Sequence, residues 1–407
     1  MDRRTLLKAG GMAVVGLGLG GCANRRTPAR PMRPPVNLVP VHVSWDRVIH
    51  TTVGLRPHRP SGFVVRTEKL DHKTVIHNYG HGGAGISLSW GTGYLAADMA
   101  MGHPDRRAAV IGSGAVGLAT ARQLQRRGIK VTIYAMAVPP NTTSNMAWAG
   151  FTPTSGLFAV GRRTPQWDEQ FRFAAEISYR QFQLLAGRDY GVSWIDNYST
   201  MDEMPVERIS REGSLLPEHL RTGRVILHAG EHPFPLKYAT RTPSIRIEPA
   251  TYLDALVRDF HLFDGRIVIR KFDTPRDLMS LTERLIVNCT GLGSRELFSD
   301  EELTPVKGQL TLLVPQPEVD YSTFGGLGQS DSFGIHMMPR SDGIALGGTS
   351  ERGESSMEPD GEALKRIVEG HMELFSAMRP PRPGARLTTS RTPDEVPALE
   401  SFGGLGP

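Results

Sequence analysis

A glycine-rich turn between an apolar strand and a helix constrains the fold of this 407-residue chain more than any other feature. Residues 107–111 are a short apolar run, and they lead directly into Gly112-Ser113-Gly114-Ala115-Val116-Gly117. Apolar residues continue at helical spacing as far as Gly128, and residues 129–134 form a second apolar run. We therefore predict a strand, a tight turn, a helix and a second strand, which together form the dinucleotide-binding Rossmann unit.

Each glycine of this turn has a separate role in binding a dinucleotide. Gly112 permits the tight turn, Gly114 lets a pyrophosphate approach the backbone, and Gly117 lets the helix pack closely on the strand. The first N–H groups of the helix, at the positive end of its dipole, then bind the diphosphate. A fortuitous glycine-rich turn is the alternative, but the surrounding strand, helix and second strand favour a dinucleotide site.

The second strand lacks the acidic residue that commonly binds the adenosine ribose. It ends with Tyr134-Ala135-Met136-Ala137, and the next acidic residue is Asp168. A freely exchanging NAD depends on such a contact more than an enclosed FAD does, because FAD makes many others. The sequence therefore favours FAD, and it leaves open what replaces the acidic contact at Met136.

The net charge of +5 belongs to the start of the chain. Residues 1–40 have a net charge of +6, so the other 367 residues sum to −1. A nucleic-acid-binding protein would carry its excess positive charge on the folded part, and we therefore predict no nucleic-acid partner. Two cysteines exclude a disulfide framework. The sequence also has no apolar run of about 20 residues that could span a bilayer.

The basic start of the chain has the pattern of an export signal. Arg3-Arg4-Thr5-Leu6-Leu7-Lys8 is followed by an uncharged run and then by Cys22. The paired arginines resemble a twin-arginine signal, and Leu19-Gly20-Gly21-Cys22 resembles a lipobox, in which the cysteine is lipidated. We predict export to the periplasm by the twin-arginine route, with a lipid anchor at Cys22 as a further hypothesis. A buried N-terminal helix is the alternative, which the many glycines disfavour.

Five further segments identify a family. They are Gly54-Leu55-Arg56-Pro57-His58-Arg59-Pro60, His77-Asn78-Tyr79-Gly80-His81-Gly82-Gly83-Ala84-Gly85, Thr142-Thr143-Ser144-Asn145, Val287-Asn288-Cys289-Thr290-Gly291 and Leu346-Gly347-Gly348-Thr349. With the glycine-rich turn, they resemble the D-amino-acid oxidase family of FAD-dependent amine oxidoreductases over nearly all of residues 46–378. The long run of histidines and glycines makes this resemblance specific, because G-x-G-x-x-G alone indicates only a dinucleotide.

The order of these segments differs from the usual order in that family. The Gly-Leu-Arg-Pro and His-Asn-Tyr-Gly-His-Gly-Gly segments normally follow the Leu-Gly-Gly-Thr strand, whereas here they precede the Rossmann strand. We infer a circular permutation, with the usual termini joined near residues 98–107 and new ends between a helix near 362–378 and a strand near 46–53. It predicts that residues 46–100 pair in space with the later segments. A Rossmann domain that carries an unrelated N-terminal domain is the alternative.

The resemblance implies an α/β fold, with a Rossmann-type FAD-binding domain and a second, mostly antiparallel substrate domain. The expected layout is an export signal (1–22), a Pro-rich tether (23–45), the permuted segment with the FAD-binding unit (46–160), a first part of the substrate domain (161–249), a return of the FAD domain (250–300), a second part of the substrate domain (301–378) and a tail (379–407).

The resemblance also implies the roles of individual residues. Arg56 anchors the substrate carboxylate, because its planar fork suits two charge-assisted hydrogen bonds. The Gly83 carbonyl accepts a hydrogen bond from the substrate amine, and Ser87 hydrogen-bonds the flavin pyrimidine. The residues expected to contact FAD are Gly112, Ser113, Gly114, Ala115, Val116, Gly117, Thr142, Thr143, Ser144, Gly82, Gly83, Ala84, Gly85, Ile86, Ser87, Thr290 and Gly291.

Three other side chains have alternative roles. His336 occupies the place of a tyrosine usual in the family, and it is either a donor to the substrate carboxylate or a plain pocket wall. His77 and His81 are four residues apart, but a metal pair at this spacing needs a helix, and Asn-Tyr-Gly between them favours a loop. We therefore predict no metal site. Cys289 is expected to be a packing residue.

The predicted reaction is the oxidative deamination of D-amino acids. The Cα hydride passes to flavin N5, the imine hydrolyses to a 2-oxo acid and ammonia, and O₂ or another acceptor reoxidises the flavin, O₂ giving peroxide. An FAD enzyme that acts on another amine, such as sarcosine, and a non-catalytic flavin-binding lipoprotein are the alternatives. The predicted partners are a small amino acid or amine, an electron acceptor and, through Cys22 only, a membrane.

Overall fold

The computed structural model describes residues 33–159, 161–205, 215–327 and 334–389. Residues 1–34 and 35–407 form two separate units, and every element named below belongs to the second. The predicted export signal, its Cys22 and the end of the predicted tail lie outside the described residues. No helix in the described ranges combines the length and the apolar character needed to cross a bilayer.

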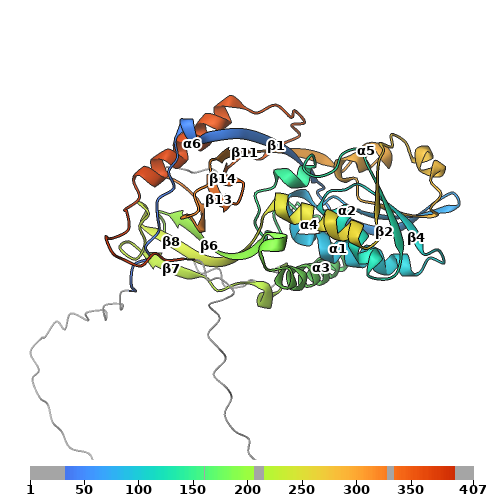
Figure 1. Ribbon diagram of the computed structural model, residues 1–407, viewed down its shortest axis with the longest axis horizontal. Helices are drawn as coiled ribbons and strands as arrows, with labels where there is room; N and C mark the ends of the chain where they lie inside the picture. Colours follow the sequence, from blue (N-terminus) through green and yellow to red (C-terminus); the bar gives the residue numbers. More distant parts are fainter. Residues whose placement is uncertain (1–32, 160, 206–214, 328–333, 390–407) are drawn as a thin grey trace, which may run out of the picture. The chain divides into compact units, whose positions relative to one another are not determined.

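In the described ranges the strands form two sheets, and the glycine-rich turn follows a strand of the smaller one, which has six strands (Figure 1). Its strands, in spatial order, are β2 (Val64–Leu70), β3 (Lys73–Tyr79), β10 (Leu285–Asn288), β4 (Arg107–Ile111), β5 (Lys130–Ala135) and β9 (Arg266–Ile269). All neighbours are parallel except β2, which pairs antiparallel with β3. The apolar runs in β4 and β10 do not alternate with polar residues, because nearly every residue of these strands is buried.

Helices lie against this sheet and against each other. α1 (Gly85–Met101) and α2 (Ala115–Gln125) pack on its strands, α3 (Pro165–Leu184) packs against α1, and α4 (Pro249–Leu262) packs against α2. A separate apolar cluster joins Val75 and Ile286 of the strands to Leu278 of η6 (Pro275–Ser280) and Leu297 of α5 (Ser294–Leu297). The strand, turn, helix and strand predicted for residues 107–134 are confirmed as β4, α2 and β5.

The second sheet has nine strands in the part of the chain that the structure describes, and it is mostly antiparallel. Its main path is β1 (Val48–His58), β11 (Thr304–Leu313), β14 (Gly343–Gly347), β13 (His336–Arg340), β12 (Tyr321–Phe324), β6 (Val192–Met201), β8 (Tyr238–Ile247) and β7 (Val225–His228), and β15 (Glu351–Arg352) pairs with β11. Only β12 and β6 are parallel neighbours. α6 (Gly361–Ser376) contributes Ile367 and Phe375 to the core of this sheet. The two sheets confirm the predicted fold class.

Short 3₁₀ helices connect these elements. They are η1 (Trp45–Arg47), η2 (Gly82–Ala84), η3 (Thr143–Met146), η4 (Arg188–Tyr190), η5 (Glu218–Leu220) and η7 (Gly291–Gly293). η2, η3 and η7 contain residues that the sequence analysis assigned to the cofactor site, and η2 leads directly into α1.

Strands from the beginning of the chain complete both sheets. β1 pairs antiparallel with β11, which in turn pairs with β14, so only β11 separates residues 48–58 from residues 343–347. In the smaller sheet, β3 pairs in parallel with β10, with Ile76 opposite Val287. These registers confirm the prediction that residues 46–100 pair with the later segments.

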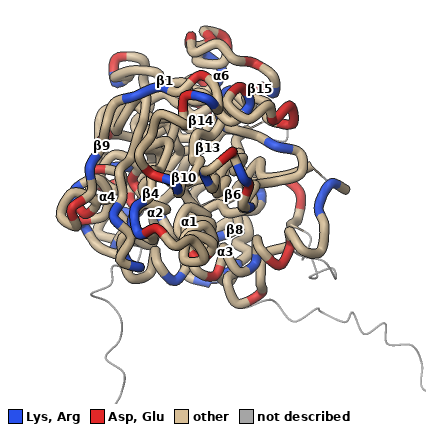
Figure 2. Tube along the Cα trace, turned by 90° about the vertical axis from the view of Figure 1, so that its right-hand side faces the viewer, with Lys and Arg blue, Asp and Glu red and all other residues tan. Residues whose placement is uncertain are grey.

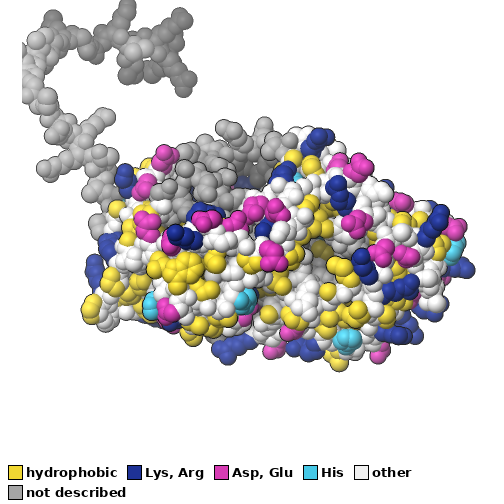
Figure 3. Space-filling model, turned by 90° about the horizontal axis from the view of Figure 1, so that it is seen from above, with side chains coloured by type: hydrophobic (Ala, Val, Ile, Leu, Met, Phe, Trp, Pro, Cys, Tyr) yellow, Lys and Arg dark blue, Asp and Glu magenta, His cyan; other side chains and the backbone are white. Residues whose placement is uncertain are grey.

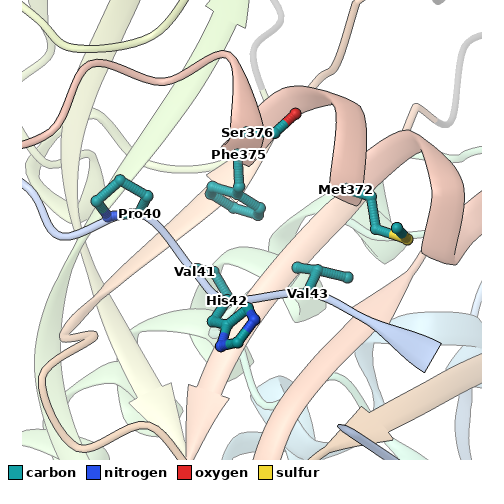
Figure 4. Close-up of a pocket in the computed structure, with 7 residues that line it drawn as sticks. All are labelled: Pro40, Val41, His42, Val43, Met372, Phe375 and Ser376. Carbon is teal, nitrogen blue, oxygen red and sulfur yellow. The ribbon is translucent and has the colours of Figure 1, made fainter. Parts of the chain in front are cut away.

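The predicted Pro-rich tether is wrong for residues 35–45, which pack on the larger sheet and α6. Leu38, Val41 and Val43 are buried in the same apolar cluster as α6. Figure 4 shows Val41 and Val43 beside Met372 and Phe375 of that helix. The prolines exclude helix and strand here, but an extended segment without either can still bury a side chain at intervals, which composition does not reveal.

Hydrogen bonds fix this segment as well. The His42 backbone exchanges two bonds with the Gln316 side chain, of 2.8 and 3.0 Å. The Tyr321 hydroxyl donates to the Val39 carbonyl at 2.7 Å. Residues 35–45 therefore belong to the folded part of the chain rather than to a linker.

Both signs of charge are spread over the described part of the chain. Figure 2 shows lysine and arginine interspersed with aspartate and glutamate along the trace, and the face in Figure 3 shows the same mixture. This distribution agrees with the net charge of −1 over residues 41–407. The charge of the folded part is thus balanced locally as well as in sum.

Replacing Leu38 with alanine should destabilise the protein by about 2–5 kcal/mol, because the substitution leaves a cavity in an otherwise filled cluster. Chemical denaturation of the purified protein would measure the loss. His42→Ala is the matched control, since His42 lies in the same segment with an exposed side chain and bonds Gln316 through its backbone. Equal stability of Leu38→Ala and wild type would show that the segment is a tether after all.

Candidate functional site

The glycine-rich turn between β4 and α2 admits no larger residue at two of its positions. Gly112 has a φ of +107°, and a Cβ there would lie 2.5 Å from the Cys289 carbonyl oxygen. A Cβ on Gly117 would lie 2.1 Å from the carbonyl oxygen of Gly112. The turn, the helix and the end of β10 are therefore in backbone contact, as the sequence analysis expected of these glycines.

A hydroxyl-rich segment lies at the N-terminus of α2. The Ser144 hydroxyl of η3 accepts a hydrogen bond of 3.0 Å from the Ala115 N–H. Thr142 donates to Asn145 of the same segment, and Thr143 begins η3. Ser113 donates to the Ala137 carbonyl at 2.6 Å, which ties the turn to the end of β5. The Ser144 hydroxyl and the backbone N–H groups in the first turn of α2, which includes Val116, are therefore neighbouring hydrogen-bond donors.

The end of β10 is fixed by a small network of hydroxyls. Thr290 donates to the Asn288 side chain at 2.8 Å and lies 2.8 Å from the Ser294 hydroxyl. Gly291 has a φ of +59°, which favours glycine there. Cys289 is buried, and burial raises the pKa of its thiol to about 12. The thiolate is therefore not populated near neutral pH, as expected of a packing residue.

Met136 offers nothing that would replace an acidic ribose contact. It follows β5, and 74% of its side chain is exposed. A thioether is only a weak hydrogen-bond acceptor. The donors available at this end of the site are instead backbone groups and the Ser144 hydroxyl, since Ser113 already donates its proton to Ala137.

The predicted flavin segment forms η2 and the first turn of α1. Gly82 has a φ of +53°, and a Cβ there would lie 2.0 Å from the Gly156 carbonyl oxygen. Gly85 begins α1, and Ala84, Ile86 and Ser87 are the buried residues around this start. The Ser87 hydroxyl accepts a hydrogen bond of 2.8 Å from the Thr152 N–H, which leaves its own proton free for one donation.

His77 and His81 do not form a pair. His77 lies in β3 and contacts Glu68 and Asn288, whereas His81 follows the strand and bonds Thr92 at 3.0 Å. Burial lowers the pKa of His81 to about 3, so its imidazole is neutral. Across the described residues, no three histidine, cysteine or acidic side chains are grouped as metal ligands would be.

Arg56 of β1 lies over a space that Gly308 of β11 leaves open. A Cβ on Gly308 would lie 2.4 Å from Nη2 and 2.6 Å from Cζ of Arg56. The guanidinium donates to the Thr349 carbonyl over 3.3 and 3.5 Å, and no carboxylate of the described ranges pairs with it. Burial lowers the pKa of Arg56, but a guanidinium remains charged. A partly buried cation without an anion is costly, so this position favours a negatively charged ligand.

His336 of β13 occupies a second space, left open by Gly347 of β14. A Cβ on Gly347 would lie 2.3 Å from His336 Nε2. The imidazole stacks on Phe324 at 5.2 Å between ring centroids and meets Trp148 edge-on at 5.3 Å. Burial above all, and then the charges of His371 and Arg56, lower the pKa of His336 to about 3. A neutral imidazole beside Arg56 adds no second positive charge.

Trp148, Phe324 and Gly308 are parts of this site that the sequence analysis missed. Trp148 follows the hydroxyl-rich segment of residues 142–145 in the chain, and Phe324 is the last residue of β12. Neither has a signal in the sequence, because only the folded sheet brings them to His336. Gly308 did have one: a glycine inside a strand commonly marks the close approach of another group, and here that group is the guanidinium.

The fold and the glycine-rich turn define a dinucleotide-binding α/β protein, and comparison with known families specifies the dinucleotide. The family model described as "DAO: FAD dependent oxidoreductase" matches residues 32–99 and 107–404. The chain belongs to this family of FAD-dependent oxidoreductases, and its cofactor is FAD.

Known relatives are distant in sequence. D-aspartate oxidase of Homo sapiens is 26% identical over 315 residues, which are 73% of this chain and 88% of the relative. D-amino-acid oxidase of Rubrobacter xylanophilus is 27% identical over 321 residues, 73% of this chain and 89% of the relative. The crystal structure of glycine oxidase from Geobacillus kaustophilus matches with a TM-score of 0.50 and 17% identity, covering 72% of this chain and 85% of that one. This last similarity shows the fold alone.

The residues of the site fit FAD. The turn at Gly112 and Gly117 brings the backbone close, as a dinucleotide pyrophosphate requires. The first turn of α2 has N–H groups without helical partners. Trp148 Nε1 and His336 Nδ1 are buried without a hydrogen-bond partner among the described residues. A cofactor and its substrate are suitable partners for such groups.

Proposed function

We propose that this enzyme catalyses the oxidative deamination of D-amino acids. The observation that carries the proposal is Arg56, a partly buried cation over Gly308 that has no carboxylate partner in the described part of the chain. Arginine is the side chain best suited to bind a carboxylate through two parallel hydrogen bonds. The names of the curated relatives, D-aspartate oxidase and D-amino-acid oxidase, support a D-amino acid as the owner of that carboxylate.

The residues around Arg56 have complementary roles in this proposal. The Gly83 carbonyl is the acceptor for the substrate amine, and a Cβ on Gly83 would lie 3.5 Å from Arg56 Cδ, so the two groups are neighbours. FAD, when bound, supplies the chemistry that accepts two electrons. Neutral His336 and the rings of Trp148 and Phe324 exclude water from one side of the site. The imine product hydrolyses in water to a 2-oxo acid and ammonia.

The proposal predicts that D-amino acids, and not L-amino acids, bleach the flavin. The experiment uses protein without residues 1–22, records its visible spectrum, and adds each amino acid anaerobically. Oxygen is then admitted and peroxide is assayed, which distinguishes O₂ from another acceptor. Bleaching by sarcosine but by no D-amino acid would replace the proposal with the secondary-amine alternative, which is open because His336 occupies the place of a tyrosine. A yellow protein that no amine bleaches would be the non-catalytic flavoprotein.

Arg56→Ala should raise KM for the D-amino acid by roughly 100-fold or more, because two hydrogen bonds to a charged group are lost. Gly308→Ala should act in the same direction, since its Cβ would displace the guanidinium. Both variants should keep their flavin. Gly361→Ala is the control, because a Cβ there meets open space at the start of α6. An unchanged KM for Arg56→Ala would show that the carboxylate is bound elsewhere.

We infer in addition that the chain is a circular permutant of the family order. β1 and β3, which carry the segments in the unexpected order, pair with β11 and β10 rather than forming a separate domain. The family model also matches in two pieces, separated at residues 100–106 between α1 and β4. A Rossmann domain with an unrelated N-terminal domain does not account for these pairings.

A chain rebuilt to begin at residue 107, continue to 389 and run through a flexible linker into residues 35–101 would test the permutation. It should fold and bind FAD with an unchanged visible spectrum, since every strand pairing remains available. A rebuilt chain that is colourless but folded, as judged by circular dichroism, would argue that the present order is required.

We propose finally that the protein is exported by the twin-arginine route and held at the membrane through Cys22. The support lies in the sequence of residues 1–22, which precede the described part. In a bacterial host, Arg3→Lys with Arg4→Lys should leave the enzyme in the cytoplasm. Cys22→Ala should move it from the membrane fraction to the soluble periplasmic fraction. A membrane fraction unaffected by Cys22→Ala would contradict the lipid anchor.

A further inference from the structure

The segment of residues 152–159 passes over the residues assigned to the flavin and the substrate. Hydrogen bonds fix it to them at its start, middle and end. At its start, the Thr152 N–H donates to Ser87 at 2.8 Å. In its middle, the Gly156 carbonyl lies 2.9 Å from His58 Nδ1. At its end, the Ala159 N–H donates to the Pro60 carbonyl at 2.8 Å. The segment has no helix or strand of its own, so these bonds fix its path over residues 56–60 and 82–87.

His58 makes the central attachment. It ends β1 two residues after Arg56, so the two side chains lie on the same face of the strand. Only 2% of His58 is exposed. Because a carbonyl oxygen can only accept, Nδ1 carries the proton of this bond. Nε2 is buried and has no partner among the described residues, so the bond to Gly156 is the only polar contact that orients the ring.

The hydrogen bond from His58 holds the Gly156 carbonyl close to the Gly82–Gly83 turn. A Cβ on Gly82 would lie 2.0 Å from the Gly156 carbonyl oxygen, the same oxygen that accepts from His58. The carbonyl is thus enclosed between the imidazole and the glycine. Ser155 directly precedes Gly156, and its own N–H donates to the Thr152 carbonyl at 3.1 Å, so the bond from His58 is one of two that fix the backbone at residue 155.

Ser155 is thereby placed beside the two groups that the proposed function assigns to the substrate. A Cβ on Gly83 would lie 3.0 Å from the Ser155 hydroxyl oxygen and 3.5 Å from Arg56 Cδ. Ser155 is exposed, as are Thr154 and Gly156 beside it, whereas Arg56 and Gly83 are partly buried. A hydroxyl at this point both donates and accepts, which suits a ligand with a carboxylate and an amine.

We propose that Ser155 is a substrate-contacting residue and that His58 is the positioning residue that holds it in place through Gly156. Ser155 hydrogen-bonds the amino acid bound between Arg56 and Gly83. His58 touches neither substrate nor cofactor in this assignment. The inference rests on the proposed function, and it adds one binding residue from outside the motifs of the sequence analysis and a positioning role for His58, which lies within the segment of residues 54–60.

The experiment compares Ser155→Ala, His58→Leu and His58→Asn in FAD-loaded protein without residues 1–22. KM for the D-amino acid is measured with kcat, and the Kd of the 2-oxo acid product is measured from the change in the flavin absorption spectrum. Ser155→Ala and His58→Leu should each weaken both affinities by roughly threefold to tenfold, the worth of one hydrogen bond, with kcat changed much less. His58→Asn retains an N–H near Nδ1 and should recover most of the affinity.

A double mutant separates the positioning role from a general structural one. If His58 acts through Ser155, then His58→Leu should add little to Ser155→Ala, so the two effects are not additive. His50→Leu is the matched control, because His50 lies on the same strand with an exposed side chain opposite Leu312. It should leave KM and Kd unchanged.

Either of two kinds of result, one for Ser155 and one for His58, would overturn the inference while the wild type still oxidises D-amino acids. One is an unchanged KM and Kd in Ser155→Ala, which, with its exposed side chain, should fold normally. The other is full additivity of the two substitutions, or His58→Asn no better than His58→Leu. If no D-amino acid bleaches the wild-type flavin, the proposed function itself fails, and this is seen before any variant is compared.

Discussion

The pairing of β1 with β11 holds the substrate side of this protein together. It sets Gly54 opposite Gly308, and it brings the guanidinium of Arg56 into the space that Gly308 leaves. The same strand then delivers His58 to the 152–159 segment. One antiparallel register therefore positions the Arg56 cation, the space at Gly308 that accommodates it, and the His58 side chain that bonds the neighbouring segment. A slip of one residue would turn all of these side chains to the opposite face.

Glycines act here by providing space as well as conformational freedom. Gly308 and Gly347 leave room for the side chains of Arg56 and His336, whereas Gly82 and Gly117 leave room for backbone carbonyls. The desolvated guanidinium and the unpartnered ring nitrogens of His336 and His58 carry an energetic cost in the protein alone. Binding of an anionic ligand offsets part of that cost at Arg56. The site is thus shaped for a ligand before one arrives, which reduces the reorganisation that binding requires.

The parts of the fold that local chemistry dictates could be predicted from the sequence, and the parts that depend on distant strands could not. The unit of β4, α2 and β5 was predictable because periodicity and the positions of Gly112, Gly114 and Gly117 are local signals. Arg56 was found only through its motif. Trp148 lies outside the strands of the larger sheet, and Phe324 meets His336 only through the pairing of β12 with β13, so no local pattern relates them. The burial of Leu38 was missed for a different reason. The prolines near it indicate an extended chain, but they do not indicate where that chain packs.

The position of β10 has a consequence for the order in which the smaller sheet is assembled. β2, β3, α1, β4, α2 and β5 follow one another along the chain, so both glycine turns of the cofactor site arise from one continuous stretch. β10 nevertheless lies between β3 and β4, which have no direct pairing with each other. The two halves of the cofactor site contact each other directly through α1 and α2, but β3 and β4 are joined in one sheet only through residues 285–288. Completion of the sheet beside this flavin site is therefore a late, non-local event of folding, delayed by the loop-closure entropy that such contacts require.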